Sequence, residues 1–167
     1  MKKYDVVIGI DPDVDKSGVA YVELESRILE AMSLTFAELL DYLQELRDIL
    51  TERGKSFVVV VEAGWLNKAH WHVGKGGSAA RSAAIGNHTG RNHEVGRKTV
   101  EMCRHYGIEV VEQPPLRKMW KGKDGKITHE ELQIFTGITG KTNQEARDAA
   151  LLAWEYAGLP IKLKSKN

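Results

Sequence analysis

The stretch FVVVVEA, residues 57–63, is the most hydrophobic short run in the chain, and it carries one acid near its end, Glu62. A continuous β-branched run of this length is typical of a strand that is buried on both faces of a sheet. The run YDVVIGIDP, residues 4–12, has the same form and reaches its own acid, Asp11, just before a proline. Because the run at 57–63 comes after a long helical segment, it is predicted to be an interior strand parallel to the strand at 4–10.

The segments between these two runs have the patterns of further strands and of a long helix. Residues 17–24 and 27–34 are strand-like, and the short breaks between them favour an antiparallel meander with the first strand. A helix is predicted over residues 35–54, because apolar residues recur there at helical spacing behind a capping box formed by Thr35 and Glu38.

The second half of the chain alternates between irregular and periodic segments. Residues 64–88 contain Gly, Ser, His and Trp with little periodicity, so they are predicted to form a mobile basic loop. The remaining predicted elements are, in order, a helix at 89–106, a strand at 108–112, a basic connector at 117–126, a helix from about 128, a helix at 143–156 and a frayed tail at 160–167.

This order of elements, β-β-β-α-β-α-β-α-α, predicts the fold class. A three-strand meander followed by two strands that are reached through helices gives a mixed five-stranded sheet with helices on both faces, which is an α/β fold. A chain of 167 residues suits one domain, and it contains no internal repeat. Residues 1–167 are therefore expected to form a single domain.

The composition narrows the setting in which the protein works. With 42% hydrophobic and 28% charged residues, the chain is typical of globular proteins, and no apolar run is long enough for a membrane span. The N-terminus has no secretory signal pattern. Cys103 is the only cysteine, which excludes an intramolecular disulfide and a cysteine-based zinc cluster. A cytoplasmic protein with no membrane partner is expected.

Charge is distributed unevenly along the chain. Residues 1–63 contain 7 Lys or Arg and 13 Asp or Glu, whereas residues 64–126 contain 12 and 5. An acidic first part beside a basic middle suits a metal site next to a surface that binds a polyanion. A solvated loop region with spare lysines is the alternative interpretation.

Four acids are candidates for a catalytic metal centre. Asp11 and Glu62 end the two predicted parallel strands, so both are expected at the same edge of the sheet. Glu145 and Asp148 lie three residues apart, and therefore on one face of the last helix, beside alanines that let this helix approach the sheet closely. Phosphodiester hydrolysis by two metal ions needs carboxylates that converge on sites about 4 Å apart.

Each of these acids also has a structural interpretation. Asp11 could start an Asp-Pro turn, and Glu62 could cap its strand or pair with an arginine. Asp148 could pair with Arg147 or Arg91 rather than with a metal.

The remaining acids leave two more alternatives open. Glu145 could complete a capping box with Thr142 instead of binding a metal. Asp13 and Asp15 are predicted to be turn residues, although either could sit beside a second metal ion.

With these acids in place, the chain resembles the RuvC-type Holliday-junction resolvases of the ribonuclease H-like superfamily. Residues 9–12 (GIDP) and 17–20 (SGVA) resemble the opening strand-turn-strand of that family, and residues 58–62 (VVVVE) resemble its second acidic strand. Residues 145–153 (EARDAALLA) resemble its terminal helix, where two acids three apart complete the site. The resemblance covers residues 5–157.

The resemblance implies a ribonuclease H-like fold and a magnesium- or manganese-dependent endonuclease. Such enzymes act on structured DNA, above all the Holliday junction, often as homodimers and without a nucleotide cofactor. The metal ligands that the resemblance implies are Asp11, Glu62, Glu145 and Asp148. Asp13 stands where members of the family usually have glycine, and the loop after Glu62 is longer than theirs, so a looser substrate range fits equally well.

Several side chains are expected to contact nucleic acid. Trp65 or Trp71 could stack on an unpaired base, or could instead pack the loop onto the body. By the resemblance, Lys118, Lys121 and Lys123 fall in the basic stretch before the last acidic helix, and Lys118 or Lys121 could neutralise the phosphate during cleavage. The further residues expected to contact phosphates are Lys68, Lys75, Arg81, Arg91, Arg97 and Lys98.

Other functions remain open at this point. A nuclease acting on RNA or on RNA–DNA hybrids, and a catalytically silent nucleic-acid-binding module, would use the same fold. Residues 11–18 loosely resemble the first phosphate loop of the actin-like ATPases, which need two such domains. Residues 74–78 lack the spacing of a P-loop. His70 and His72 have no neighbouring cysteine or acid that would complete a zinc site.

Overall fold

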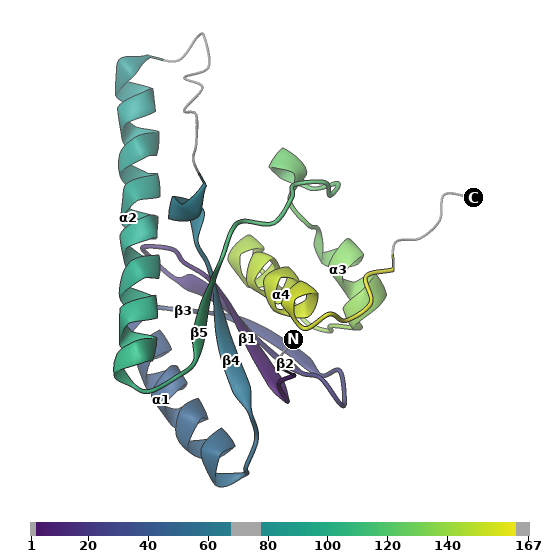
Figure 1. The fold of residues 1–167 in the computed structure, drawn as a ribbon. Helices are drawn as coiled ribbons and strands as arrows, with labels where there is room; N and C mark the ends of the chain where they lie inside the picture. The colour runs from purple at the N-terminus through teal and green to yellow at the C-terminus, as the bar shows by residue number, and fades with distance from the viewer. Residues whose placement is uncertain (1–2, 68–77, 163–167) are drawn as a thin grey trace, which may run out of the picture.

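A computed structural model describes residues 3–67 and 78–162 of the protein (Figure 1). The strands are β1 Val6–Asp11, β2 Ser17–Glu23, β3 Leu29–Leu34, β4 Phe57–Glu62 and β5 Val110–Gln113. They form one sheet in the order β3-β2-β1-β4-β5. β1, β2 and β3 pair antiparallel, whereas β4 runs parallel to both β1 and β5. The predicted mixed five-stranded sheet is confirmed.

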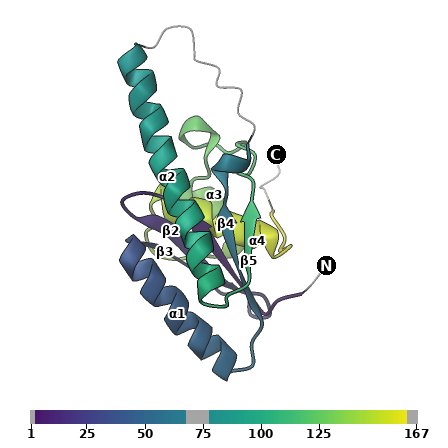
Figure 2. The ribbon, with the colours of Figure 1, turned by 60° about the vertical axis from the view of Figure 1, so that its left-hand side comes forward.

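Helices cover both faces of this sheet, as predicted (Figures 1 and 2). α1 and α2 lie on one face, and α4 crosses the other face with α3 beside it. The predicted capping boxes of Thr35 with Glu38 and of Thr128 with Glu131 are both present. The helices are α1 Phe36–Glu52, α2 Ala79–His105, α3 His129–Thr136 and α4 Gln144–Tyr156, with short 3-10 turns η1 Gly64–Leu66 and η2 Lys123–Gly125.

Both faces of the central strands are buried, which explains their continuous hydrophobic runs. Val7 and Val58 belong to the core on the α4 side, whereas Ile8 and Val59 belong to the core on the side of α1 and α2. Successive side chains of a strand point to opposite faces, so each run fills two cores at once. The same alternation directs Asp11, four residues after Val7, to the α4 side.

The prediction of a loop over residues 64–88 is wrong for much of its length. Residues 64–66 form η1, and α2 begins at Ala79, where the Ser78 hydroxyl accepts a hydrogen bond from the backbone N–H of Arg81. The early turns of α2 project beyond the sheet and are largely exposed (Figures 1 and 2). They carry no apolar stripe for a periodicity argument to detect, although alanine favours helix. Residues 68–77 lie outside the described part.

The C-terminal end adds little to the fold. Residues 160–162 form no regular element, and the rest of the predicted frayed tail lies outside the described residues. Within residues 3–67 and 78–162, no helix combines the length and the apolar character that crossing a bilayer would require.

Two glycines let α4 lie directly on the sheet. A Cβ atom added to Gly9 would lie 2.3 Å from the carbonyl oxygen of Ala149, and one added to Gly18 would lie 1.9 Å from that of Glu145. Both distances are far below a normal contact, so only glycine allows the helix backbone to approach β1 and β2 this closely. This approach sets the position of every side chain that α4 presents to the sheet edge.

Candidate active site

Two of the four predicted acids end neighbouring parallel strands. Ile10 of β1 pairs with Val61 of β4, so the next residues, Asp11 and Glu62, reach the same edge of the sheet. Both carboxylates line one pocket of about 380 Å³. The structure therefore brings these two acids together as the sequence predicted.

Helix α4 brings the third acid to the same place. Asp148 lines the pocket with Asp11 and Glu62, and only 15% of its side chain is exposed. The opposite walls come from His93 of α2 and from Lys118, which lies in the segment after β5. Three carboxylates from three separate elements thus meet in one pocket between α2 and this basic segment.

The pocket makes its carboxylates harder to ionise. Desolvation raises the pKa of Asp11 well above its ordinary value, and the charges of Glu62 and Asp148 raise it further. The pKa of Glu62 is raised by desolvation and by the charge of Asp148, while Lys126 and Lys118 oppose the change. The three carboxylates repel one another, and an environment of this kind favours a bound cation.

A lysine already compensates part of this charge. The ammonium of Lys126 donates to Oδ2 of Asp148 at 3.0 Å, and the side-chain amide of Gln144 donates to Oδ1 of the same carboxylate at 2.7 Å. Asp148 therefore does not pair with Arg147 or Arg91, which were the two alternatives. Arg147 instead donates to backbone carbonyls at Ile127 and Thr142, and so joins the start of α4 to the preceding segment.

The fourth predicted acid lies apart from the pocket. Glu145 is in the first turn of α4, but it does not line the pocket with Asp148. The alternative of a capping box with Thr142 is wrong, because Asn143 is the N-cap and accepts from the backbone N–H of Ala146 at 2.9 Å. Glu145 still contributes to the negative potential, since its charge is among those that raise the pKa of Asp11.

The donor chemistry of the pocket fits a hard divalent cation. Carboxylate oxygens are the ligands that Mg²⁺ and Mn²⁺ prefer, and Asp11, Glu62 and Asp148 supply them from one pocket. Among the residues that the structure describes, however, no three Asp, Glu, His or Cys side chains are already arranged around one point. Each oxygen of Asp148 already accepts one hydrogen bond, from Lys126 or from Gln144, so a metal ion would share this carboxylate with both side chains.

A short hairpin holds the basic wall of the pocket in place. The backbone N–H of Trp120 donates to the carbonyl of Gly125, and that of Gly122 donates to the carbonyl of Lys126. The buried carboxylate of Glu131 accepts from the backbone N–H of Lys121 at 3.1 Å, in addition to its role in the cap of α3. The backbone that carries Lys126 is therefore held by hydrogen bonds.

The other acids near β1, Asp13 and Asp15, do not line the pocket. Asp13 accepts at 2.8 Å from the backbone N–H of Asp15, which makes it the predicted turn residue. Asn92 of α2 reaches the same turn, where its side-chain oxygen accepts from the backbone N–H of Val14 at 2.9 Å. Helix α2 thus fastens the turn that follows Asp11.

The described tryptophan of the predicted loop packs onto the body, which was the structural alternative for it. The indole N–H of Trp65 donates to Glu112 at 3.1 Å, and its ring lies 6.0 Å from that of His93 in an edge-on arrangement. The guanidinium of Arg97 lies over the same ring at 5.4 Å from its centre. Gly96 leaves room for this packing. Trp65 is therefore held in place against the body.

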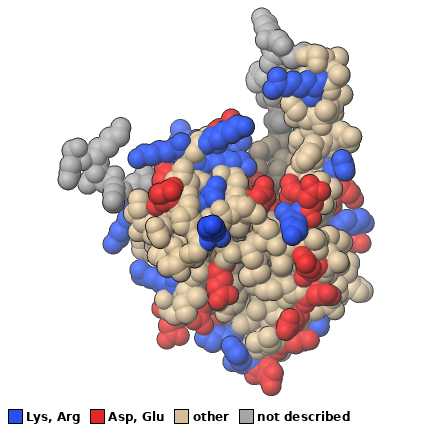
Figure 3. Space-filling view, turned by 180° about the vertical axis from the view of Figure 1, so that it is seen from behind, with Lys and Arg blue, Asp and Glu red and all other residues tan. Residues whose placement is uncertain are grey.

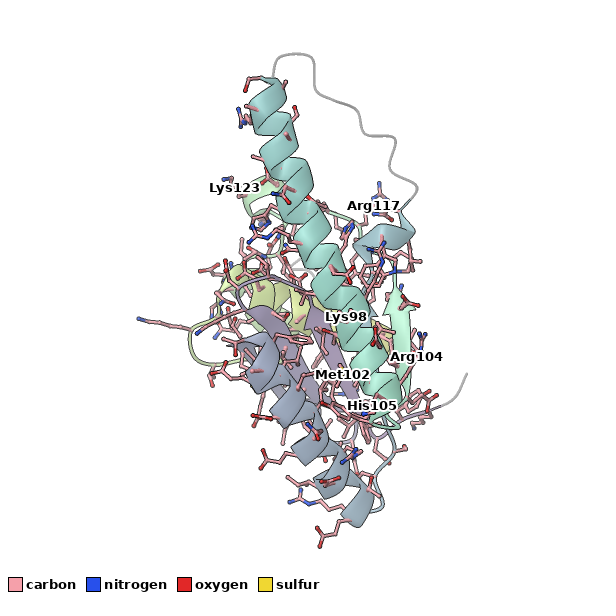
Figure 4. The ribbon with its side chains drawn as sticks, turned by 90° about the vertical axis from the view of Figure 1, so that its left-hand side faces the viewer. Lys98, Met102, Arg104, His105, Arg117 and Lys123 are labelled. Carbon is pink, nitrogen blue, oxygen red and sulfur yellow. The ribbon has the colours of Figure 1, made fainter. Side chains whose placement is uncertain are left out.

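The remaining basic residues fall into separate regions. Arg81 and Arg91 lie on the exposed early turns of α2. Lys98 lies on the outer face of the same helix in line with Met102 and His105 (Figure 4), and it pairs with Glu101 at 2.9 Å. The predictions for Lys68, Trp71 and Lys75, like the remarks on His70 and His72, lie outside the described residues.

Sequence reasoning did not select three residues that line the pocket. Lys126 and Arg117 belong to the basic connector, where one lysine could not be distinguished from another. His93 falls in a helix whose register relative to the sheet was unknown, and its ring lies against Gly64, two residues after Glu62. A helical projection of residues 92, 93 and 96 would have placed them on one face of α2.

Comparisons with solved structures identify the fold. RuvC of Thermus thermophilus in complex with a Holliday junction substrate aligns with a TM-score of 0.53 at 15% identity, over 92% of this chain and 93% of that chain. Another structure of Thermus thermophilus RuvC aligns with a TM-score of 0.44 at 18% identity, over 92% and 97% of the two chains. A Fowlpox virus resolvase in complex with Holliday junction DNA gives 0.39 at 12%, over 92% and 97%.

Of these alignments, the first confirms the fold that the resemblance implied. It shows that the chain has the ribonuclease H-like fold of RuvC over nearly its whole length. No family model and no curated protein matches the sequence. Function therefore has to be argued from the site itself.

Proposed function

We propose that the protein is a metal-dependent endonuclease that cleaves phosphodiester bonds in structured DNA, with the four-way junction as its main substrate. The observation that carries this proposal is the convergence of Asp11, Glu62 and Asp148, from β1, β4 and α4, in one pocket at the sheet edge. Partly buried carboxylates that repel one another are unfavourable in a metal-free protein, and they are expected where a cation is needed.

The surroundings of the pocket suit a polyanion. Lys and Arg side chains gather along the top of the body beside the projecting α2 (Figure 3). Arg117 and Lys118 line the pocket itself, and Lys121 and Lys123 lie on the same hairpin. Phosphates held by such a surface would be brought to the carboxylates, and the affinity would fall with salt. The fold neighbour RuvC was solved with a Holliday junction substrate, which supports branched DNA as the ligand.

The residues of the pocket would have separate roles in hydrolysis. Asp11, Glu62 and Asp148 would hold Mg²⁺ or Mn²⁺, with Glu145 as a further ligand if it turns toward the pocket. A bound metal ion of this kind supplies activation of water and stabilisation of the leaving oxygen. Lys118 and Arg117 on the wall would bind the scissile phosphate and offset the charge that builds on it.

A homodimer would match the symmetry of the substrate. A four-way junction offers two equivalent strands, and a two-fold dimer would place one pocket at each of them.

A panel of labelled substrates tests the proposed function. Four-way junction, flap, plain duplex, RNA–DNA hybrid and single-stranded RNA would each be incubated with the protein in Mg²⁺, in Mn²⁺ and in EDTA. We expect cleavage of the junction in either metal and none in EDTA. Preferred cutting of the hybrid or of RNA would favour the ribonuclease alternative. Tight binding without cutting under any metal would show a silent binding module and contradict the proposal.

A further inference from the structure

Lys126 occupies an unusual position for a lysine beside a candidate metal site. Its ammonium lies 3.0 Å from Oδ2 of Asp148, and the two side chains are 40% and 15% exposed. The same ammonium acts on the other two carboxylates, since its charge opposes the rise of the pKa that desolvation causes at Asp11 and Glu62. One lysine therefore partly neutralises all three acids of the pocket.

Backbone hydrogen bonds hold Lys126 where its side chain reaches Asp148. Its carbonyl accepts from the N–H of Gly122 at 2.9 Å, and its own N–H donates to the carbonyl of Lys123 at 3.1 Å. Two residues later, Thr128 caps α3 together with Glu131. Both backbone groups of Lys126 are therefore hydrogen-bonded within the hairpin. This fixes the position from which its side chain reaches Asp148.

This contact engages an oxygen that a divalent cation would need. Gln144 already holds Oδ1 of Asp148 at 2.7 Å, so Lys126 engages the other oxygen of the carboxylate. An ammonium at this distance also repels a second cation in the partly desolvated pocket. A metal ion that binds Asp148 therefore competes electrostatically with Lys126 for the same carboxylate.

We propose that Lys126 is a resident counter-ion that stabilises the metal-free pocket and competes with the divalent cation for Asp148. The lysine thereby sets the metal concentration at which the pocket fills. This inference rests on the proposed role of the pocket as a metal site, but it concerns metal binding alone and requires no nucleic acid.

A second lysine in the chain provides a matched control. Lys55 pairs with Glu23 at 3.4 Å, with side chains 33% and 25% exposed, which is a similar degree of burial. Lys55 lies just before β4, and therefore at the opposite end of that strand from Glu62. Losing this ion pair removes one lysine–carboxylate contact without changing the pocket.

The test is a calorimetric titration of Mn²⁺ into the protein without DNA, for the wild type, Lys126→Met, Lys126→Gln and Lys55→Met. Both changes at Lys126 are expected to tighten Mn²⁺ binding by about tenfold, within the usual range for coupled ligands. Lys55→Met should leave the affinity unchanged. In EDTA the Lys126 variants should unfold at a lower temperature than the wild type, and Mn²⁺ should raise their Tm more than it raises that of the wild type.

Other outcomes would overturn the inference. Mn²⁺ binding to folded Lys126 variants that is no tighter than to the wild type would show that the lysine does not compete. Absence of Mn²⁺ binding to every variant would also contradict it. A third outcome separates the two proposals. If the Lys126 variants bind Mn²⁺ more tightly than the wild type but the protein cuts no substrate, the nuclease proposal is wrong and this inference holds.

Discussion

Asp11→Asn is expected to reduce cleavage by at least about a thousandfold, because removing a metal ligand forfeits several kcal/mol of transition-state stabilisation. Asparagine has nearly the shape of aspartate, but its neutral amide is a poor ligand for a hard cation. The rate of junction cleavage in saturating Mg²⁺ measures the effect. Asp15→Asn, an exposed change on the same turn, is the matched control and should cut at the wild-type rate.

The same substitution is expected to stabilise the metal-free protein. Asp11 is desolvated beside Glu62 and Asp148, so removing its charge relieves repulsion that the folded state alone experiences. A gain of about 1 kcal/mol would raise the Tm by roughly 2–4 °C in a protein of this size. Thermal unfolding in EDTA measures it. Loss of activity together with loss of stability would indicate that Asp11 serves the fold rather than the chemistry.

Gly18→Ala is expected to damage both the fold and the site. The added methyl group would lie 1.9 Å from the carbonyl oxygen of Glu145, and a helix backbone cannot give way as a side chain can. Overpacking of this kind lowers the free energy of unfolding by about 1–3 kcal/mol. Because α4 would be pushed off β2, Asp148 would move away from Asp11, and a displacement of about 1 Å can reduce the rate about a hundredfold.

Gly86→Ala is the matched control for this substitution. A Cβ atom at Gly86 would meet nothing within 4 Å, and the residue lies in the exposed part of α2. Alanine is a better helix former there, by about 1 kcal/mol, so this variant should be slightly more stable and fully active. Urea unfolding and junction cleavage would be measured for both variants. A Gly18→Ala protein that equals the wild type in both would contradict the role given to the close approach of α4.

The central strands and two of the acids were predictable because their signals are local. A β-branched run such as residues 57–63 is typical of a strand that is buried on both faces of a sheet, and the period of two then assigns each side chain to a face. The order of the elements favoured β4 parallel to β1, and because the two strands are neighbours in the sheet, Asp11 and Glu62 share an edge. Asp148 followed from the small residues around it, which allow the helix to approach.

What the sequence did not reveal depends on contacts between distant residues. The choice of Lys126 over its neighbours as the partner of Asp148 is made by the hairpin that carries it, and no spacing rule encodes that. The packing of Trp65 depends on Glu112 and Arg97, which come from other elements. The early turns of α2 were missed because they have no apolar stripe, and periodicity is the main signal for a helix.

The central claim is that Asp11, Glu62 and Asp148 together hold the catalytic metal ion. Crystals of the protein soaked in Mn²⁺, with anomalous diffraction data, test it most directly. We expect an anomalous peak in the pocket, roughly 2 Å from an oxygen of each carboxylate, as for a hard cation with oxygen ligands. Well-ordered crystals soaked at high Mn²⁺ that show no peak among these three side chains would contradict the account.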